Sequence, residues 1–343
     1  MLFTETVENW KDWGRVFQSI PAFTPLAQEI CRREGLPWVG LSPLTPGTNG
    51  VFRCGDAVLK IFFPKESGLD PALDFHRELA VSQWAAKAGV STPAVLGQGL
   101  ICDKYGFYYL VTQYCPGEEA GPWLEEATPA QQRALVESLQ EVLVRTDRPA
   151  PGLIPQGDLK AQARTNKRLE KLTPSLREEV LHRLEGMELG EIVLTHGDLT
   201  GENLLVKEDG SLVVIDWADA RLAPAWYELG PIAFELFQGR GELLRLFAGA
   251  DRKAFIERLL DCCCLHDFGA DFLWNFWQRE GAAEFQSLAE VRGLLEEKLG
   301  RDKEKFLVKF FSKNLRGVEQ SSTALPGAAD EKMQRKRRIR RRR

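Results

Sequence analysis

The sequence lacks any apolar run close to the roughly 20 residues that a membrane-spanning helix requires. It also lacks the hydrophobic stretch of a secretory signal, because residues 1–13 carry acidic side chains early. The seven cysteines are odd in number, and three are adjacent at Cys262–Cys264, which suits neither a disulfide framework nor a Cys-x-x-Cys metal site. No internal repeat is present. These absences predict a cytoplasmic protein with reduced, buried thiols.

Basic side chains are a minority over most of the chain. Of 343 residues, 45 are Lys or Arg and 49 are Asp or Glu, but nine of the basic residues fall within 330–343, beside only two acids. The other 329 residues carry a net charge of −11. Such an acidic body disfavours nucleic acid as its partner and favours a cationic small molecule. The basic block at 335–343 is predicted to be disordered; it has the composition of a segment that contacts nucleic acid or an anionic surface, or it is incidental.

The most informative stretch is Leu194–Asp219, LTHGDLTGENLLVKEDGSLVVIDWAD. Two apolar runs flank an Asp-Gly turn, a pattern that predicts a β-hairpin. Asp198 precedes this hairpin, Asn203 begins its first strand, and Asp216 follows its second strand. We therefore expect Asn203 and Asp216 to lie close together.

These residue types at this spacing indicate phosphoryl transfer. In an H-x-D-x-x-x-x-N motif the Asp accepts the proton of the attacking hydroxyl, and the Asn holds a metal ion. A second Asp on the next strand holds Mg²⁺ against the nucleotide phosphates. Hard oxygen ligands at strand ends suit Mg²⁺. The motif predicts Asp198 as the catalytic base and Asn203 and Asp216 as metal ligands; any one of them alone would be an ordinary loop residue.

Residues 39–63 predict three short antiparallel strands, the last two joined at Gly55-Asp56. Gly47, Thr48 and Asn49 form a plausible phosphate-covering loop, because small residues let backbone amides approach phosphate oxygens; a tight hairpin turn would look the same. Lys60 interrupts an apolar strand, so it is either solvated or paired. The helix predicted at 75–88 offers Glu78 as that partner, and such a paired lysine reaches the phosphates in kinases.

The strand predicted from Tyr108 ends at Pro116-Gly117, which marks the expected boundary between two lobes. In a kinase this linker offers backbone groups to the nucleotide base, here at Gln113 and Cys115. A plain edge strand and turn would have the same sequence. Length and composition, with 44% hydrophobic and 27% charged residues, also suit two lobes of an ordinary globular protein.

Helices are predicted at 129–145, 160–172 and 227–237 and through the aromatic-rich last third of the chain. Two helices are also predicted within 1–38, with Pro21 and Pro25 between them. In the last third, Asp261, Asp267 and Asp271 form a hypothetical pocket for an amine-bearing substrate. The alternative metal site at His266 and the three adjacent cysteines has the wrong spacing for tetrahedral coordination.

We expect four parts: an N-terminal helical extension at 1–38, a nucleotide-binding lobe at 39–113, a lobe at 114–320 with the catalytic loop, metal site and substrate-binding helices, and a basic tail at 321–343. The motifs H196-G-D-L-T-G-E-N203 and V214-I-D-W-A-D-A220 resemble those of the aminoglycoside phosphotransferase and choline kinase-like superfamily. The resemblance extends over residues 47–239 and is specific to the superfamily, not to a substrate.

This resemblance implies an α+β, two-lobed protein-kinase-like fold with a small antiparallel-sheet N-lobe and a mainly helical C-lobe. It implies an enzyme that uses ATP, or GTP, and Mg²⁺ to phosphorylate a small-molecule hydroxyl. Lys60 would contact phosphate and Glu78 would orient it. Glu228 stands where the superfamily often has Asp, and Ala223 replaces the acid that often precedes Pro, so the anchoring of the catalytic loop differs.

Two other functions remain open from the sequence. A protein kinase is disfavoured because Gly197 replaces the Arg usual before the catalytic Asp, and because only eleven residues separate Asp216 from Glu228. A nucleotide-binding pseudokinase with an interaction tail would have a broken catalytic set, whereas all five residues of the set are present here.

Overall fold

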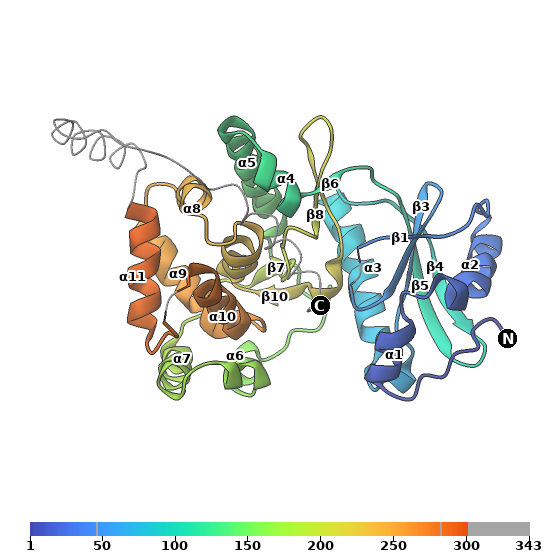
Figure 1. Ribbon diagram of the computed structural model, residues 1–343, viewed down its shortest axis with the longest axis horizontal. Coiled ribbons are helices and arrows are strands. Elements are labelled where there is room, and N and C mark those ends of the chain that lie inside the picture. Colours follow the sequence, from blue (N-terminus) through green and yellow to red (C-terminus); the bar gives the residue numbers. More distant parts are fainter. Residues whose placement is uncertain (46, 282, 301–343) are drawn as a thin grey trace, which may run out of the picture. The chain divides into compact units, whose positions relative to one another are not determined.

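The computed structural model of this protein describes residues 1–45, 47–281 and 283–300. The expected basic tail at 321–343 lies outside them, as do residues 301–320 of the expected C-lobe. Within the described part, a small antiparallel sheet is followed along the chain by a larger group of helices (Figure 1). None of the described helices combines the length and hydropathy that crossing a bilayer requires.

The N-lobe sheet has the strand order β1-β2-β3-β5-β4, and every neighbouring pair is antiparallel. The predicted β2–β3 hairpin is confirmed, because Cys54 pairs with Ala57 across Gly55-Asp56. The sequence analysis did not predict β4, since its glycines at 97 and 99 are typical of turns. The bounds are β1 Ser42–Pro43, β2 Gly50–Cys54, β3 Ala57–Ile61, β4 Val95–Cys102 and β5 Gly106–Gln113.

Helices cover both faces of this sheet (Figure 1). On one face, α1 (Trp10–Val16) and α2 (Ile20–Glu34) share an apolar core with β2, β3 and β5. The prediction that Pro21 and Pro25 separate two helices is wrong. Both lie inside α2, and Pro21 is at the first turn, where no backbone N–H is needed.

On the other face, α3 (Pro71–Lys87) lies between the sheet and the helical lobe. It begins four residues earlier than predicted, because the Asp70 side chain accepts from the Ala72 amide at 3.0 Å and caps the first turn. This helix carries Glu78, which is buried on the side that faces β3.

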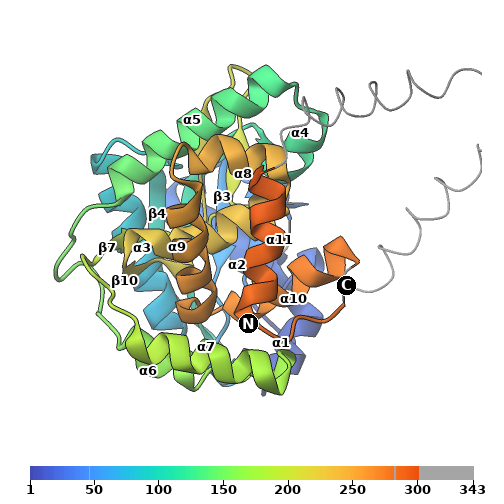
Figure 2. The ribbon, with the colours of Figure 1, turned by 90° about the vertical axis from the view of Figure 1, so that its left-hand side faces the viewer.

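The C-lobe is a bundle of helices around a single large apolar core. Seen end-on, α5 borders one side of the bundle and α6 and α7 the other (Figure 2). The helix predicted at 129–145 is confirmed as α5, which starts with a capping box of Thr128 and Gln131. The bounds are α4 Ala120–Glu126, α5 Pro129–Thr146, α6 Leu159–Arg164, α7 Pro174–Gly186, α8 Gly241–Ala248, α9 Arg252–Leu265, α10 Gly269–Glu280 and α11 Leu288–Gly300.

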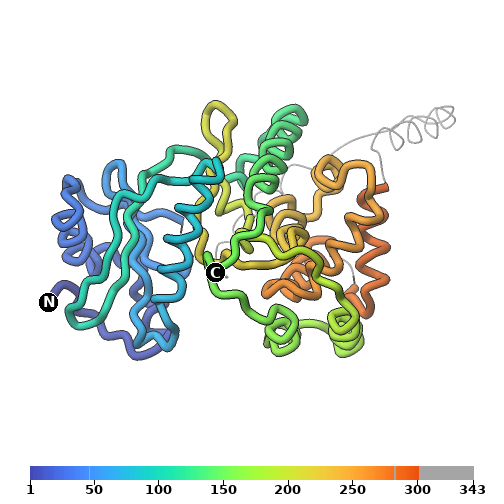
Figure 3. The backbone as a smooth tube through the Cα atoms, turned by 180° about the vertical axis from the view of Figure 1, so that it is seen from behind, coloured from blue at the N-terminus to red at the C-terminus, as the bar shows by residue number. Residues whose placement is uncertain are grey.

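Short strands in the C-lobe hold the segment that carries Asp198, Asn203 and Asp216. The predicted hairpin is confirmed as β8–β9, with Leu204 opposite Val214; it lies beside α5 in Figure 3. Strand β6 extends this hairpin, and β7 pairs with β10 so that Thr195 faces Arg221. The bounds are β6 Glu118–Glu119, β7 Val193–Thr195, β8 Leu204–Val206, β9 Leu212–Val214 and β10 Arg221–Ala223.

Two predicted helices are broken. The helix expected at 160–172 stops at Arg164 and resumes as a 3₁₀ turn, Lys167–Lys171, because Asn166 caps that turn and donates to the Asp267 carbonyl. The helix expected at 227–237 is a 3₁₀ turn, Ala225–Glu228, followed by a π-helical segment, Pro231–Leu236. Pro231 supplies no backbone N–H and so interrupts an α-helical ladder.

Replacing Phe23 with Ala should lower the free energy of unfolding by about 3–5 kcal/mol. Phe23 is fully buried, and the rings of Phe3, Phe52 and Trp13 lie 5.0, 5.3 and 5.8 Å from it. Denaturant titration measures the change. Val144→Ala, at a residue that is 70% exposed, should change stability by less than about 0.5 kcal/mol. Similar losses in the two variants would contradict a core role for α2.

Candidate active site

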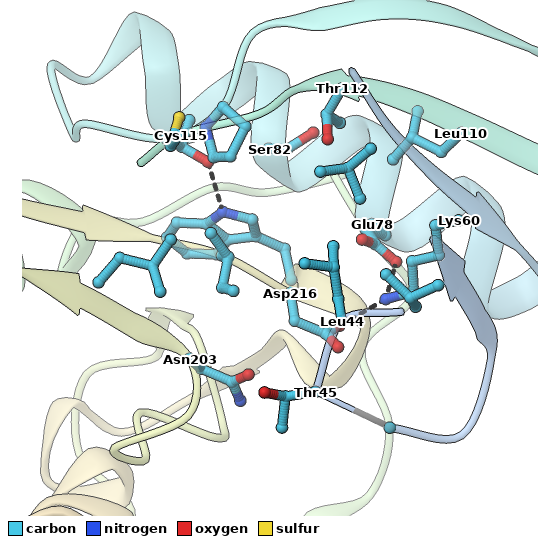
Figure 4. Close-up of a pocket in the computed structure, with 18 of the residues that line it drawn as sticks. Leu44, Thr45, Lys60, Glu78, Ser82, Leu110, Thr112, Cys115, Asn203 and Asp216 are labelled. Carbon is cyan, nitrogen blue, oxygen red and sulfur yellow. Dashed lines mark hydrogen bonds and ion pairs between the residues drawn. The ribbon is translucent and has the colours of Figure 1, made fainter. Parts of the chain in front are cut away.

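A cavity of about 260 Å³ opens between the sheet and the β8–β9 hairpin. Apolar side chains from the sheet form its roof, and others from the hairpin and the segment after it form its floor (Figure 4). Such an apolar slot with few polar groups is typical of a small-molecule site. All seven residues that the sequence analysis assigned to nucleotide binding line it: Gly47, Thr48, Asn49, Lys60, Glu78, Gln113 and Cys115.

One buried ammonium links the two lobes at this cavity. Lys60 Nζ lies 2.7 Å from a Glu78 carboxylate oxygen and 2.8 Å from Asp216 Oδ1. Figure 4 shows the three side chains pointing toward one another. Lys60 and Glu78 are 8% and 6% exposed, whereas the Asp216 side chain is 40% exposed and faces the cavity. The solvated alternative for Lys60 therefore does not apply.

The charges of this group are mutually dependent. Burial lowers the pKa of Lys60, but the charges of Asp216 and Glu78 outweigh burial, so its net pKa shift is upward and it stays protonated. Burial likewise opposes ionisation of Asp216, yet the charge of Lys60 holds its pKa below the ordinary value. For Glu78, burial dominates over the charge of Lys60 and raises the pKa to about 7.

Asp216 has a backbone conformation that L-residues rarely adopt, with φ of 60° and ψ of 75°. Its side chain accepts from the Ala218 amide and so caps the following 3₁₀ turn, Trp217–Asp219. Residues held in left-handed conformations cost free energy and cluster at functional sites. The turn aims the carboxylate into the cavity.

Asp198 and Asn203 are in direct contact. The Asn203 amide donates to Asp198 Oδ2 at 2.8 Å and to the Asp198 carbonyl at 2.9 Å. Burial, followed by the nearby charges of Asp219 and Asp216, raises the pKa of Asp198 to about 7. A carboxylate poised near neutrality suits a general base. Asp198 lies outside the cavity lining itself, next to the mouth where Asn203 lies.

Two buried, neutral histidines hold the loop that carries Asp198. His196 Nδ1 accepts from the Asp198 amide at 3.2 Å, so its Nε2 donates to the Ile215 carbonyl at 3.0 Å. Burial lowers the pKa of His196 to about 4, which agrees with a neutral ring. His266, from the end of α9, donates through Nε2 to the Gly197 carbonyl at 3.1 Å. His266 therefore supports the loop that carries Asp198, and its ring is not part of a cysteine-based metal site.

Glu228 anchors the same loop. Its Oε1 accepts from the Gly197 amide at 2.8 Å, and the residue is 1% exposed. Gly197 has φ of +81°, and a Cβ there would lie 2.4 Å from the Asp219 carbonyl oxygen. Only glycine fits. The sequence analysis expected that Glu, in place of the more usual Asp, changes how this loop is anchored. In the structure the anchor is the hydrogen bond from the Gly197 amide to the Glu228 carboxylate.

The two lobes meet at the linker after β5. The Gln113 amide already donates to the Ala94 carbonyl at 2.8 Å, so this donor is not available to a ligand. Tyr114 donates to the Asp56 carbonyl. The expected backbone contacts to a nucleotide base stay a prediction for the Gln113 carbonyl and for Cys115, both of which line the cavity.

The three acids proposed for an amine-bearing substrate do not share one pocket. Asp261 pairs with Arg183 and Arg258, and Asp271 pairs with Arg168 and Lys171. Each of these two acids is thereby neutralised by two cations at a helix junction. Asp267 pairs with Arg221 at 2.6 Å, and it directly follows His266, which contacts the loop that carries Asp198.

The donor set at the cavity mouth fits Mg²⁺. The Asn203 amide nitrogen is engaged with Asp198, so its oxygen is turned toward Asp216 in Figure 4. Asp216 uses Oδ1 for Lys60 and keeps its exposed side toward the cavity. Among the described residues, no cluster of three or more His, Cys, Asp or Glu could hold a metal alone. Two oxygen ligands completed by phosphates and water are how Mg²⁺ commonly binds.

The sequence analysis missed several cavity residues. Trp217 forms part of the floor and is fixed by its indole N–H, which donates to Thr92 Oγ1 at 3.0 Å. Glu119, at the start of α4, accepts a hydrogen bond from Thr45 across the mouth. The position of Trp217 directly after a predicted metal ligand was an available signal. The Thr45–Glu119 contact joins residues 74 apart and had no local signal.

Comparisons with known proteins agree with this geometry. A model of the phosphotransferase enzyme family matches residues 43–259. Wild-type aminoglycoside 2′-phosphotransferase-IIIa in its GDP complex is 17% identical, with 82% of this chain and 99% of that chain covered and a TM-score of 0.56. No match was found among curated protein sequences.

Two further solved structures are similar. A thermostable mutant of aminoglycoside phosphotransferase APH(4)-Ia, in a ternary complex with ADP and hygromycin B, is 17% identical over 79% of this chain and 97% of its own, with a TM-score of 0.53. The GDP and kanamycin complex of APH(2″)-IIIa is 17% identical over 80% of this chain and 98% of its own, with a TM-score of 0.55. These structures confirm the predicted two-lobed, protein-kinase-like fold.

Replacing Glu228 with Gln should flatten the dependence of stability on pH. Burial raises the pKa of Glu228 from 4.5 to about 8, so between these values the folded protein keeps a proton that the unfolded chain releases. The wild type therefore loses stability as pH rises through this window. Gln still accepts from Gly197 but cannot titrate. Unfolding measured from pH 5 to 8 should show the shallower slope.

Glu141→Gln is the matched control, because the Glu141 side chain is 73% exposed. Its pH profile should coincide with that of the wild type. Parallel profiles for the wild type and Glu228→Gln would show that the Glu228 carboxyl group keeps the same protonation state in the folded and unfolded protein.

Proposed function

Because the chain belongs to the phosphotransferase enzyme family, we propose that it transfers the γ-phosphate of ATP or GTP to a hydroxyl group of a small molecule. The observation that carries the proposal is the convergence of Asp198, Asn203 and the Lys60–Asp216 pair at the mouth of one cavity. The nucleotide complexes of the similar structures, with ADP in one and GDP in two others, support a nucleotide in this cavity.

Each residue has one task in this proposal. The apolar roof and floor hold the base, and the Gln113 carbonyl and the Cys115 backbone contact its edge. Lys60, oriented by Glu78, contacts the phosphates. Asn203 and Asp216 hold Mg²⁺, which neutralises charge on the phosphate oxygens when bound. Asp198 takes the proton of the acceptor hydroxyl as the new P–O bond forms and the bond to the nucleoside diphosphate breaks.

We propose a cationic, amine-bearing acceptor of the aminoglycoside type. The body of the chain has a net charge of −11, and Asp219, Asp216 and Glu202 lie close enough to Asp198 to raise its pKa. Such a concentration of negative charge beside the base attracts a cation. Hygromycin B and kanamycin, named for two of the similar structures, are examples of the class to test.

The protein-kinase alternative is less well supported. The eleven residues between Asp216 and Glu228 pack into a 3₁₀ turn, strand β10 and a second 3₁₀ turn. Ala220, Ala223 and Tyr227 of this segment are at most 1% exposed. A segment packed in this way leaves no exposed activation loop on which a peptide could dock.

Replacing Asp198 with Ala should reduce phosphate transfer by about 10²–10⁴-fold, because the acceptor hydroxyl loses its base. The measurement is coupled nucleotide consumption by the purified protein with a panel of hydroxylated amines, sugars and antibiotics. Nucleotide binding measured by calorimetry should change less than about twofold. Asp209→Ala, in the exposed β8–β9 turn, is the control and should keep full activity. Undiminished transfer by Asp198→Ala would refute the assignment.

Removing divalent metal with a chelator should abolish transfer, and Mg²⁺ should restore it. Asn203→Ala should raise the Mg²⁺ concentration for half-maximal activity by about tenfold or more, because one of two protein oxygen ligands is lost. Asn275→Ala, at an Asn that contacts Glu235 in the helical lobe, should leave this concentration unchanged. Full activity in the chelated wild type would exclude the metal role.

A further inference from the structure

Helix α1 touches the back of the phosphate-covering loop. The indole Nε1 of Trp13 donates to the Thr48 carbonyl at 2.8 Å, across 35 residues of sequence. Trp13 is 1% exposed, and its ring packs edge-on against Phe23 at 5.8 Å. The hydrogen bond therefore comes from a side chain whose position is fixed by the N-lobe core.

Two more contacts fix the end of the loop. A Cβ on Gly50 would lie 3.0 Å from the Phe17 carbonyl oxygen, so the loop backbone sits flush against the end of α1. Asn49, 3% exposed, accepts from the Phe63 amide through Oδ1 at 3.2 Å. Phe63 in turn packs against Trp10 of α1, with ring centroids 5.4 Å apart.

The Trp13 hydrogen bond sets the direction of a whole peptide unit. A trans peptide is planar, so its C=O and N–H groups point in opposite directions. With the Thr48 carbonyl held by Trp13 on the α1 side, the Asn49 N–H points the other way. Thr48 and Asn49 both line the cavity. Backbone amides presented in this manner bind phosphate oxygens.

We infer that helix α1 holds the phosphate-covering loop in its binding conformation, and that Trp13 is the positioning residue. The inference rests on the proposed nucleotide binding. It gives a role to α1, which belongs to the N-terminal helical extension expected at 1–38. This extension precedes residue 43, where the family match begins. Trp13 contacts no substrate; it acts through Thr48 on the phosphates alone and not on the base.

Trp13→Phe removes the indole N–H and keeps a buried aromatic ring. Trp274→Phe is the matched control: it makes the same exchange on α10 of the helical lobe, at a residue that is 40% exposed and packs against Trp277. Calorimetric titration of the full chain uses ATP and GTP with Mg²⁺, and adenosine and guanosine. Trp13→Phe should bind the preferred triphosphate about 3- to 10-fold more weakly, the effect of one hydrogen bond, and bind its nucleoside as the wild type does.

Equal weakening of triphosphate and nucleoside binding, or no weakening of either, would overturn the inference and leave the proposed function standing. A wild-type protein that binds neither triphosphate would instead overturn the proposed function. Amide hydrogen exchange without nucleotide gives a separate readout, and it should be faster across residues 47–50 in Trp13→Phe than in Trp274→Phe. If Trp13→Phe does not fold, Gly50→Ala offers a second variant. It places a Cβ 3.0 Å from the Phe17 carbonyl oxygen, so it displaces the loop from the end of α1 and should weaken triphosphate binding selectively.

Discussion

The site depends on one buried ammonium shared by two carboxylates. Lys60 on β3 contacts Glu78 on α3 and Asp216 after β9, so a single charge group joins the sheet, the helix behind it and the C-lobe. A buried charge is tolerated only when it is paired, and removing one member of such a pair costs about 3–5 kcal/mol. The geometry of the cavity mouth is therefore tied to the contact between the lobes.

Around this charged group the supporting residues are neutral. His196 and His266 are buried and uncharged, and Glu228 is buried where its protonated form is favoured. They hold the loop that carries Asp198 by hydrogen bonds to backbone groups, without adding charge. Negative charge near the cavity therefore comes from Asp216 and from the other acids whose charges act on Asp198, namely Asp219 and Glu202.

The sequence predicted the parts of the fold that depend on neighbours in the chain. Hairpins β2–β3 and β8–β9 follow from apolar alternation and turn residues, and α5 follows from its period and its cap. The breaks in the helices predicted at 160–172 and 227–237 were missed. The first break depends on Asn166, which donates to Asp267, and a contact across 101 residues leaves no local pattern.

The sequence by itself determined which side chains meet at the proposed site. Its spacing puts Asp198 in contact with Asn203 and places Asp216 just after the strand that pairs with the strand following Asn203. Only the tertiary structure decided which acidic side chains are taken up in ion pairs. It commits Asp261 and Asp271 to ion pairs between helices and ties the loop at Thr48 to Trp13. Those partners lie on segments that are distant in the sequence and meet only when the core packs. The physical reason is that a polar or charged group buried by this packing must find a partner among the groups that packing places beside it.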